Sequence, residues 1–238
     1  MHILALETSQ LPGSIHLAEA HPGRYSSHGD LTLPDRQSTA QCFAPRIREM
    51  LHASGIGPRS IGLVAVDVGP GSFTGLRIAV TFAKTFAYAT GADVLGISSM
   101  DILAYQAAEA AEAVRAAGRR LWTAVDAHRG QVFAACYEVA PDGSVRQTVE
   151  TQLIDTDRWA ADLQAKDIVT GPVVERLGSR LSASVQVAPV AVRVPAAEWL
   201  ARIAWRRWQD GERGDLWRLS PNYIRRSAAE EKLDAAPS

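Results

Sequence analysis

The sequence predicts an α/β fold of two lobes that open in the same way. Three observations lead to this expectation. Residues 2–33 contain three short apolar strands joined by tight turns, residues 121–150 repeat that opening, and residues 61–98 have the pattern strand, glycine-rich turn, helix and strand. Tight turns join antiparallel neighbours, whereas a strand–helix–strand crossover joins parallel ones. The first lobe should therefore hold an antiparallel meander extended by parallel strands, and the second should be a reduced copy.

The composition is that of an ordinary globular protein. The 238 residues are 47% hydrophobic and 21% charged, with a formal net charge of -1, which suits one large or two small domains. Strong unaided binding of nucleic acid needs a basic surface, so this balance argues against it. No apolar run reaches the roughly 20 residues of a membrane helix, and the first residues lack a secretory leader. Cys42 and Cys136 form no CxxC pair. We expect a cytoplasmic protein without membrane association.

Residues 1–118 have the element order of an RNase H-like lobe. Apolar residues recur at the helical period after Ser38, and Pro45 should loosen the first turns of that helix. Gly91 is placed to end the helix that follows the glycine turn. The expected elements are strands at 2–8, 14–20 and 25–33, a helix at 38–54, a strand at 61–68, a helix at 76–90, a strand at 93–97 and a helix at 99–117. Nucleases and nucleotide-binding proteins share this fold, so the fold alone does not decide the function.

Residues 119–226 repeat the opening and then become irregular. The expected elements are strands at 121–125, 131–139 and 144–150, a helix at 157–163, a strand at 168–170, a helix at 173–181, a strand at 185–189 and a helix at 195–209. Two lobes of this kind, the second reduced, are the layout of the actin-like ATPase (ASKHA) superfamily. The polar, Ala-rich tail at 227–238 should be frayed.

The glycine turn GPGSFTG is the most informative motif. Its glycines, Gly69, Gly71 and Gly75, are spaced one residue too far apart for a dinucleotide fingerprint, and no Lys-Ser or Lys-Thr pair follows as in a P-loop. Glycines permit sharp turns and close approach. Ser72 and Thr74 can cap the next helix, whose free N–H groups favour an anion. The turn is therefore either an anion-binding loop or a packing turn with capping hydroxyls.

The helix after this turn is apolar over most of its circumference. Ile78, Phe82 and Phe86 lie on one line, and small residues fill the adjoining lines. A helix at a protein surface needs only one apolar stripe. We therefore expect two covers, one from its own sheet and one from another part of the chain or from a partner.

The string GPGSFTGLRI, in this strand–turn–helix setting, resembles the hallmark of the bacterial TsaB (YeaZ) family. The similarity extends more loosely from the first strand to Pro221–Arg225. It implies a non-catalytic scaffold that pairs with a TsaD-type catalytic subunit and works with a TsaE-type ATPase. Together they would form threonylcarbamoyladenosine at position 37 of tRNAs, with the chain touching tRNA only indirectly. No cofactor is implied for the chain itself, and ATP enters only at the level of the complex.

The resemblance also implies a pairing surface. We expect it on the helix after the glycine turn, together with the helix at 38–54, and a homodimer could use the same surface when the partner is missing. The residues expected to make the pairing contacts are Ala79, Thr81, Phe82, Lys84, Phe86 and Tyr88.

Three acids, Glu7, Asp67 and Asp126, stand at the ends of predicted strands. In RNase H-like folds such carboxylates can hold a divalent metal for phosphoryl transfer or nucleic-acid cleavage. The other interpretation is that acids often end strands, where solvent begins. The resembled family usually has Asp-Thr-Ser at the end of the first strand, and Glu7 departs from this pattern. A self-standing phosphotransferase or ATPase of the same superfamily is the alternative function, and a nuclease is a third.

None of the six histidines forms an HxxxH or HExxH pair on a predicted helix. The catalytic sister of the resembled family carries such a pair. We therefore expect no metal site and assign no catalytic residue.

Overall fold

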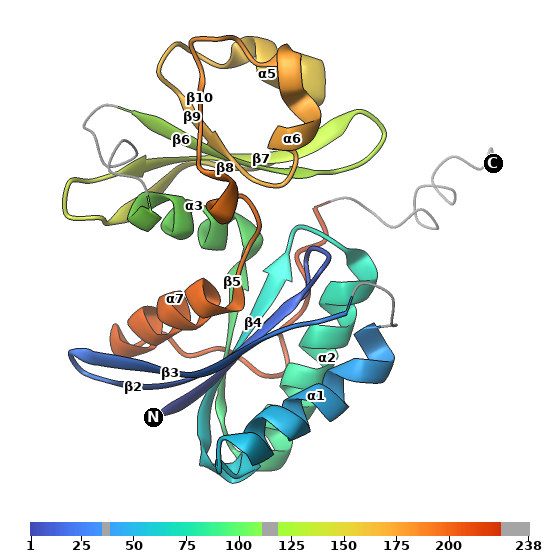
Figure 1. Ribbon diagram of the computed structural model, residues 1–238, viewed down its shortest axis with the longest axis vertical. Coiled ribbons are helices and arrows are strands. Elements are labelled where there is room, and N and C mark those ends of the chain that lie inside the picture. The colour runs from blue at the N-terminus through green and yellow to red at the C-terminus, as the bar shows by residue number, and fades with distance from the viewer. Residues whose placement is uncertain (35–38, 111–118, 225–238) are drawn as a thin grey trace.

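The computed structural model describes residues 1–34, 39–110 and 119–224, which form two α/β lobes arranged along the long axis of the molecule (Figure 1). The expected cap at Ser38, the last residues of the helix expected at 99–117 and the tail at 227–238 lie outside the described residues. Each lobe is built on a five-stranded mixed sheet. The expected fold class, two RNase H-like lobes with a reduced second copy, is confirmed.

The first sheet has the strand order β3-β2-β1-β4-β5. Strands β1, β2 and β3 pair antiparallel, whereas β4 joins β1, and β5 joins β4, in parallel register. The bounds are β1 His2–Glu7, β2 Ser14–His21, β3 Arg24–Thr32, β4 Ile61–Gly69 and β5 Asp93–Ser98, with a 3₁₀ turn η1 at Pro58–Ser60 before β4. The sequence predicted this meander and its parallel extension.

Helices cover both faces of the first sheet (Figure 1). Alternate residues of β1 face opposite sides, as the period of a strand requires. Leu4 and Leu6 pack with helices α1 (Thr39–Ala53) and α2 (Phe73–Thr90). Ile3 and Ala5 pack with helix α7 (Ala197–Gln209). Both faces are therefore buried, which explains why β1 and β4 are almost wholly apolar.

The second sheet has the order β10-β9-β6-β7-β8. Helix α3 packs on one face, and the short helices α5 and α6 pack on the other. The bounds are α3 Ser99–Ala110, β6 Arg120–Asp126, β7 Gln131–Val139, β8 Val145–Asp155, α5 Thr156–Asp162, β9 Ile168–Thr170, α6 Val174–Leu177, η2 Gly178–Arg180, β10 Gln186–Val187 and η3 Val190–Val192. The helix expected at 173–181 is thus only one turn of α-helix followed by a 3₁₀ turn.

The two lobes exchange helices, which corrects the expected division of the chain at residue 118. Helix α3 belongs to the first half of the sequence but packs on the second sheet, and α7 belongs to the second half but packs on the first. Asp101 of α3 accepts hydrogen bonds from Tyr137 Oη of β7 (2.9 Å) and Arg207 Nη2 of α7 (2.5 Å). No helix in the described part of the chain has both the length and the apolar character to span a membrane.

Candidate functional site: the buried carboxyl pair, the glycine turn and the α1–α2 face

Glu7 ends β1, Asp67 lies two residues before the end of the neighbouring parallel strand β4, and both side chains are fully buried. Glu7 Oε1 accepts hydrogen bonds from Ser9 N (2.7 Å) and Ser9 Oγ (2.6 Å). Asp67 Oδ1 accepts from Gly69 N and from Ser99 Oγ, both at 2.7 Å. Neighbouring loops and the start of α3 thus supply the donors to both groups.

The burial of these carboxyls changes their ionisation. Burial, and then the charge of Asp67, raise the pKa of Glu7 well above its ordinary value. Burial also raises the pKa of Asp67 to about 6, although the hydrogen bonds that Asp67 accepts from Gly69 and Ser99 act to lower it. Glu7 Oε2 is buried and receives no hydrogen bond from the described residues. Burial and the neighbouring carboxylate of Asp67 therefore both favour the protonated form of Glu7.

The glycine turn packs directly on the connection that follows β1. A Cβ at Gly71 would lie 2.4 Å from Ser9 O, and one at Gly75 would lie 2.1 Å from Thr8 O. The backbone N–H of Ser72 donates to Ser9 O at 2.7 Å, and Ser72 Oγ caps α2 by accepting from Gly75 N at 3.3 Å. These contacts favour the packing turn. The sequence also predicts an anion site at the turn, and this site stays a prediction. Its residues would be Gly69, Gly71, Ser72, Thr74 and Gly75.

Asp126, the third acid, ends β6 in the second sheet. Its carboxylate forms an ion pair with Arg176 and lies 3.3 Å from His128 Nδ1. Among the described residues, Glu7, Asp67 and Asp126 do not gather into one group that could hold a metal ion.

A shallow apolar groove runs along the face formed by α1 and α2. One hollow of about 570 Å³ is lined by Phe82 and Phe86 of α2, Ile47 and Leu51 of α1 and the loop at 55–58. A second hollow of about 430 Å³ continues from it past Phe82; its walls include Phe43, Ala44, Arg77, Ile78, Thr81 and Thr85. The Phe82 ring stands edge-on to that of Phe43, with centroids 5.3 Å apart. The expected pairing helices therefore share an apolar surface.

The residues expected to make pairing contacts do not all lie on this groove. Ala79 is fully buried in the core beneath α2, so the expectation that it contacts a partner is wrong. Phe82 and Phe86 line the groove and are half-buried, and Thr81 is exposed beside them. Lys84 and Tyr88 lie elsewhere, toward the C-terminal segment.

The C-terminal residues 215–223 supply part of the second cover of α2. Lys84 Nζ donates to the carbonyl oxygens of Trp217 and Leu219, both at 3.1 Å. The rings of Tyr88 and Trp217 lie 5.9 Å apart, and Arg77 Nε donates to Tyr223 Oη at 3.3 Å. The chain itself therefore covers one flank of α2, and among the described residues the groove side stays open.

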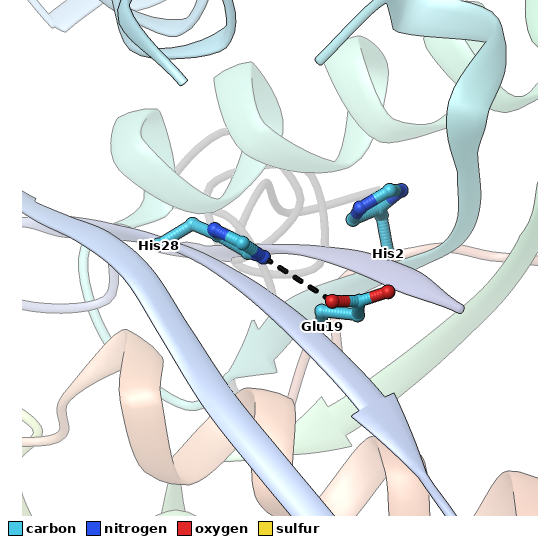
Figure 2. A group of neighbouring side chains, drawn as sticks. All are labelled: His2, Glu19 and His28. Carbon is cyan, nitrogen blue, oxygen red and sulfur yellow. Dashed lines mark ion pairs between the residues drawn. The ribbon is translucent and has the colours of Figure 1, made fainter. Parts of the chain in front are cut away.

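A second cluster lies on the first sheet. His2, Glu19 and His28 come from β1, β2 and β3, and Figure 2 shows their side chains turned toward one another. Its histidines lie on strands, so they form no pair at helical spacing along the chain. The signal that could have found it is cross-strand register, because His2 and Glu19 are direct partners in the meander.

Comparisons with known proteins converge on one family. A family model described as TsaD, tRNA N6-adenosine threonylcarbamoyltransferase, matches residues 36–202. Two similar curated proteins are both named tRNA threonylcarbamoyladenosine biosynthesis protein TsaB. The one from Bacillus subtilis is 28% identical over 202 residues, 79% of this chain and 80% of that protein. The one from Escherichia coli is 26% identical over 239 residues, 98% of each. YeaZ from Pseudomonas aeruginosa is 28% identical with a TM-score of 0.76, covering 93% of this chain and 99% of that one.

Proposed function

Because the chain belongs to the TsaD family and, within it, to the TsaB (YeaZ) group, we propose that it acts in forming threonylcarbamoyladenosine at position 37 of tRNAs. In this proposal the chain is the non-catalytic partner of a TsaD-type catalytic subunit. The observation that carries the proposal is the near full-length similarity to a protein named TsaB.

The state of the carboxyl pair supports a non-catalytic role. A carboxylate that holds a metal ion must be ionised and must reach the ion. Glu7 and Asp67 are fully buried, burial raises the pKa of both, and their oxygens accept from Ser9, Gly69 and Ser99. The arrangement stabilises the loops around the turn. It gives the alternative of a self-standing phosphotransferase or ATPase no support.

The α1–α2 groove supports the pairing. It joins two helices into one apolar surface, and Phe82 lies in both of its hollows. Aromatic anchors in such hollows carry much of the binding energy of protein interfaces. We therefore place the TsaD-type partner on this groove, with Thr81, Phe82 and Phe86 as contacts. Lys84 and Tyr88 would contact the partner only where it extends over residues 215–223.

Further parts of the assembly belong to the same proposal. A TsaE-type ATPase joins the pair, tRNA is contacted indirectly, and ATP acts at the level of the complex. A homodimer through the groove is the form expected without the partner. The assembly works in the cytoplasm.

The test measures binding to the TsaD-type subunit of the same organism by calorimetry and gel filtration. Phe82→Glu places a charge in the groove, and we expect at least about tenfold weaker binding, or about 1.4 kcal/mol. Thr81→Arg changes an exposed groove residue without touching the core and should weaken binding as well. Val190→Glu, at an exposed apolar residue of the second lobe, is the matched control and should bind as wild type does.

Two outcomes would overturn the proposal. One is unchanged affinity in both groove variants while circular dichroism shows them folded. The other is brisk ATP hydrolysis by the isolated chain that Glu7→Gln abolishes. In a reconstituted assay of tRNA modification, the groove variants should lower the yield in proportion to the loss of binding.

A further inference from the structure

We propose that His2, Glu19 and His28 form a binding site for one divalent transition-metal ion, with Zn²⁺ as the ion that best fits the donor set. Each residue offers one ligand atom, and these three atoms all lie within 4.8 Å of one another. The site lies on the β1–β2–β3 meander and shares no residue with the carboxyl pair or the α1–α2 groove (Figure 2).

The register of the meander brings the ligands together. His2 of β1 and Glu19 of β2 are direct cross-strand partners, which places their Cβ atoms about 5 Å apart on one face of the sheet. In β3, Gly29 pairs with Leu17 and Ser27 pairs with Ala18, so His28 is the extra residue of a β-bulge. Bulges redirect side chains, and Figure 2 shows the His28 ring directed toward Glu19.

The hydrogen bond that His2 makes leaves one of its ring nitrogens available to a metal ion. Ser60 O can only accept, so the His2 Nδ1 atom that lies 3.3 Å from it must carry the proton. The lone pair of His2 is then on Nε2, available to a metal. A carbonyl that fixes the tautomer in this way is a usual second partner of a metal-binding histidine.

The carboxylate is held in a similar manner. Glu19 Oε1 lies 3.1 Å from His21 Nε2. Its other oxygen, Oε2, lies 3.7 Å from His28 Nε2. One oxygen is thus oriented by His21 while the other faces the cluster.

The distances suit a transition metal. Ligand atoms of a tetrahedral zinc site lie about 3.4 Å apart, given bonds of about 2.0–2.1 Å. The Glu19–His28 separation already approaches this value, and all three side chains are at least partly exposed, so small rotations can close the rest. Two imidazoles and one carboxylate are zinc ligands, whereas Mg²⁺ and Ca²⁺ select oxygen donors alone. Three protein ligands leave a fourth position for water.

The ion would link three strands of the sheet edge. His2, Glu19 and His28 come from consecutive strands, so a bound ion would couple β1, β2 and β3 through side chains as well as through backbone hydrogen bonds. Binding to the folded chain raises its apparent stability. We therefore expect Zn²⁺ to raise the melting temperature.

The test uses the full chain without a histidine tag, stripped of metal with a chelator and titrated with ZnCl₂ at neutral pH. We expect one equivalent to bind with a Kd at or below about 10 μM. Glu19→Gln and His28→Asn should each weaken binding at least about tenfold and abolish the rise in melting temperature. Co²⁺ should give the visible absorption of a tetrahedral site in wild type and lose it in both variants.

His128→Asn is the matched control. His128 is an exposed histidine beside a carboxylate, Asp126, on the other sheet, and among the described residues it belongs to no group of three possible ligands. It should bind zinc as wild type does. The proposal is overturned if about 100 μM Zn²⁺ leaves wild type unbound, or if Glu19→Gln and His28→Asn, both folded by circular dichroism, bind as wild type does. It is also overturned if His128→Asn loses as much affinity as they do.

Discussion

Replacing Glu7 with glutamine should make the free energy of unfolding less sensitive to pH. Burial raises the pKa of Glu7 well above its ordinary value of 4.5, so the folded chain keeps a proton that the unfolded chain releases. The contribution of Glu7 to the free energy of unfolding is therefore largest below pH 4.5. It falls as pH rises from 4.5 toward the pKa of Glu7 in the folded chain. A glutamine in this place would be neutral in both states and would carry no such dependence. Glutamine also keeps an oxygen to accept from Ser9.

The size of the effect follows from proton linkage. Each pH unit between the unfolded and the folded pKa changes the stability difference by about 1.4 kcal/mol. Above pH 4.5, Glu7→Gln should therefore gain stability relative to wild type at this rate as pH rises, until the pH reaches the folded pKa of Glu7. Burial also raises the pKa of Asp67 from 3.8 to about 6, so Asp67 adds its own fall in the stability of wild type as pH rises between these two values.

Urea denaturation followed by circular dichroism at several pH values measures the difference. Glu109→Gln, at an exposed residue of α3, is the control and should show a difference from wild type that does not vary with pH. A constant difference between wild type and Glu7→Gln from about pH 5 to pH 8 would refute the inference that folding raises the pKa of Glu7. So would a loss of several kcal/mol at the highest pH, because it would mean that an ionised Glu7 holds the turn together.

Two further substitutions test the packing. Gly75→Ala puts a Cβ 2.1 Å from a backbone oxygen of the β1–β2 connection and should lower the free energy of unfolding, measured by urea denaturation, by about 1–3 kcal/mol. The control is Gly57→Ala, whose Cβ would lie 3.9 Å from its nearest neighbour and should leave stability nearly unchanged. Equal effects of the two substitutions would contradict the close approach at Gly75. Asp101→Ala removes the acceptor shared by Tyr137 of β7 and Arg207 of α7 and should cost about 2–4 kcal/mol. A change under about 0.5 kcal/mol would show that this network does not hold the lobes together.

The order of the strands could be predicted because each sheet begins with local contacts. Tight turns bring β1, β2 and β3 together, and the crossover through α2 places β5 in parallel beside β4. The position of α7 could not be predicted in this way. An amphipathic stripe shows that a helix buries one face, but not which sheet receives it, and α7 packs on the first sheet although it follows the strands of the second along the chain.

The candidate site was predicted only in part for the same reason. The turn, its capping residue Ser72 and the groove helices are local features, and the sequence identified them. Ala79 was misplaced because a small residue on an apolar helix suits a core as well as an interface. The group formed by His2, Glu19 and His28 depends on the pairing of three strands and on one bulge, which no spacing along the chain reveals.

The contacts around the glycine turn show how this motif would serve the proposed pairing. The first turn of α2 is held on the β1–β2 connection by the hydrogen bond from Ser72 N to Ser9 O and by the close approach of Gly75 to Thr8. Ser9 in turn donates twice to the buried Glu7. A chain of contacts thus runs from the carboxyl pair to the start of the helix that carries Phe82. Backbone groups used in these contacts are not free for a phosphate, and the same contacts fix the direction of α2. A partner that docks on a rigid helix loses less conformational entropy than one that must order it. In the proposed assembly the turn therefore supports pairing through the position it gives to α2.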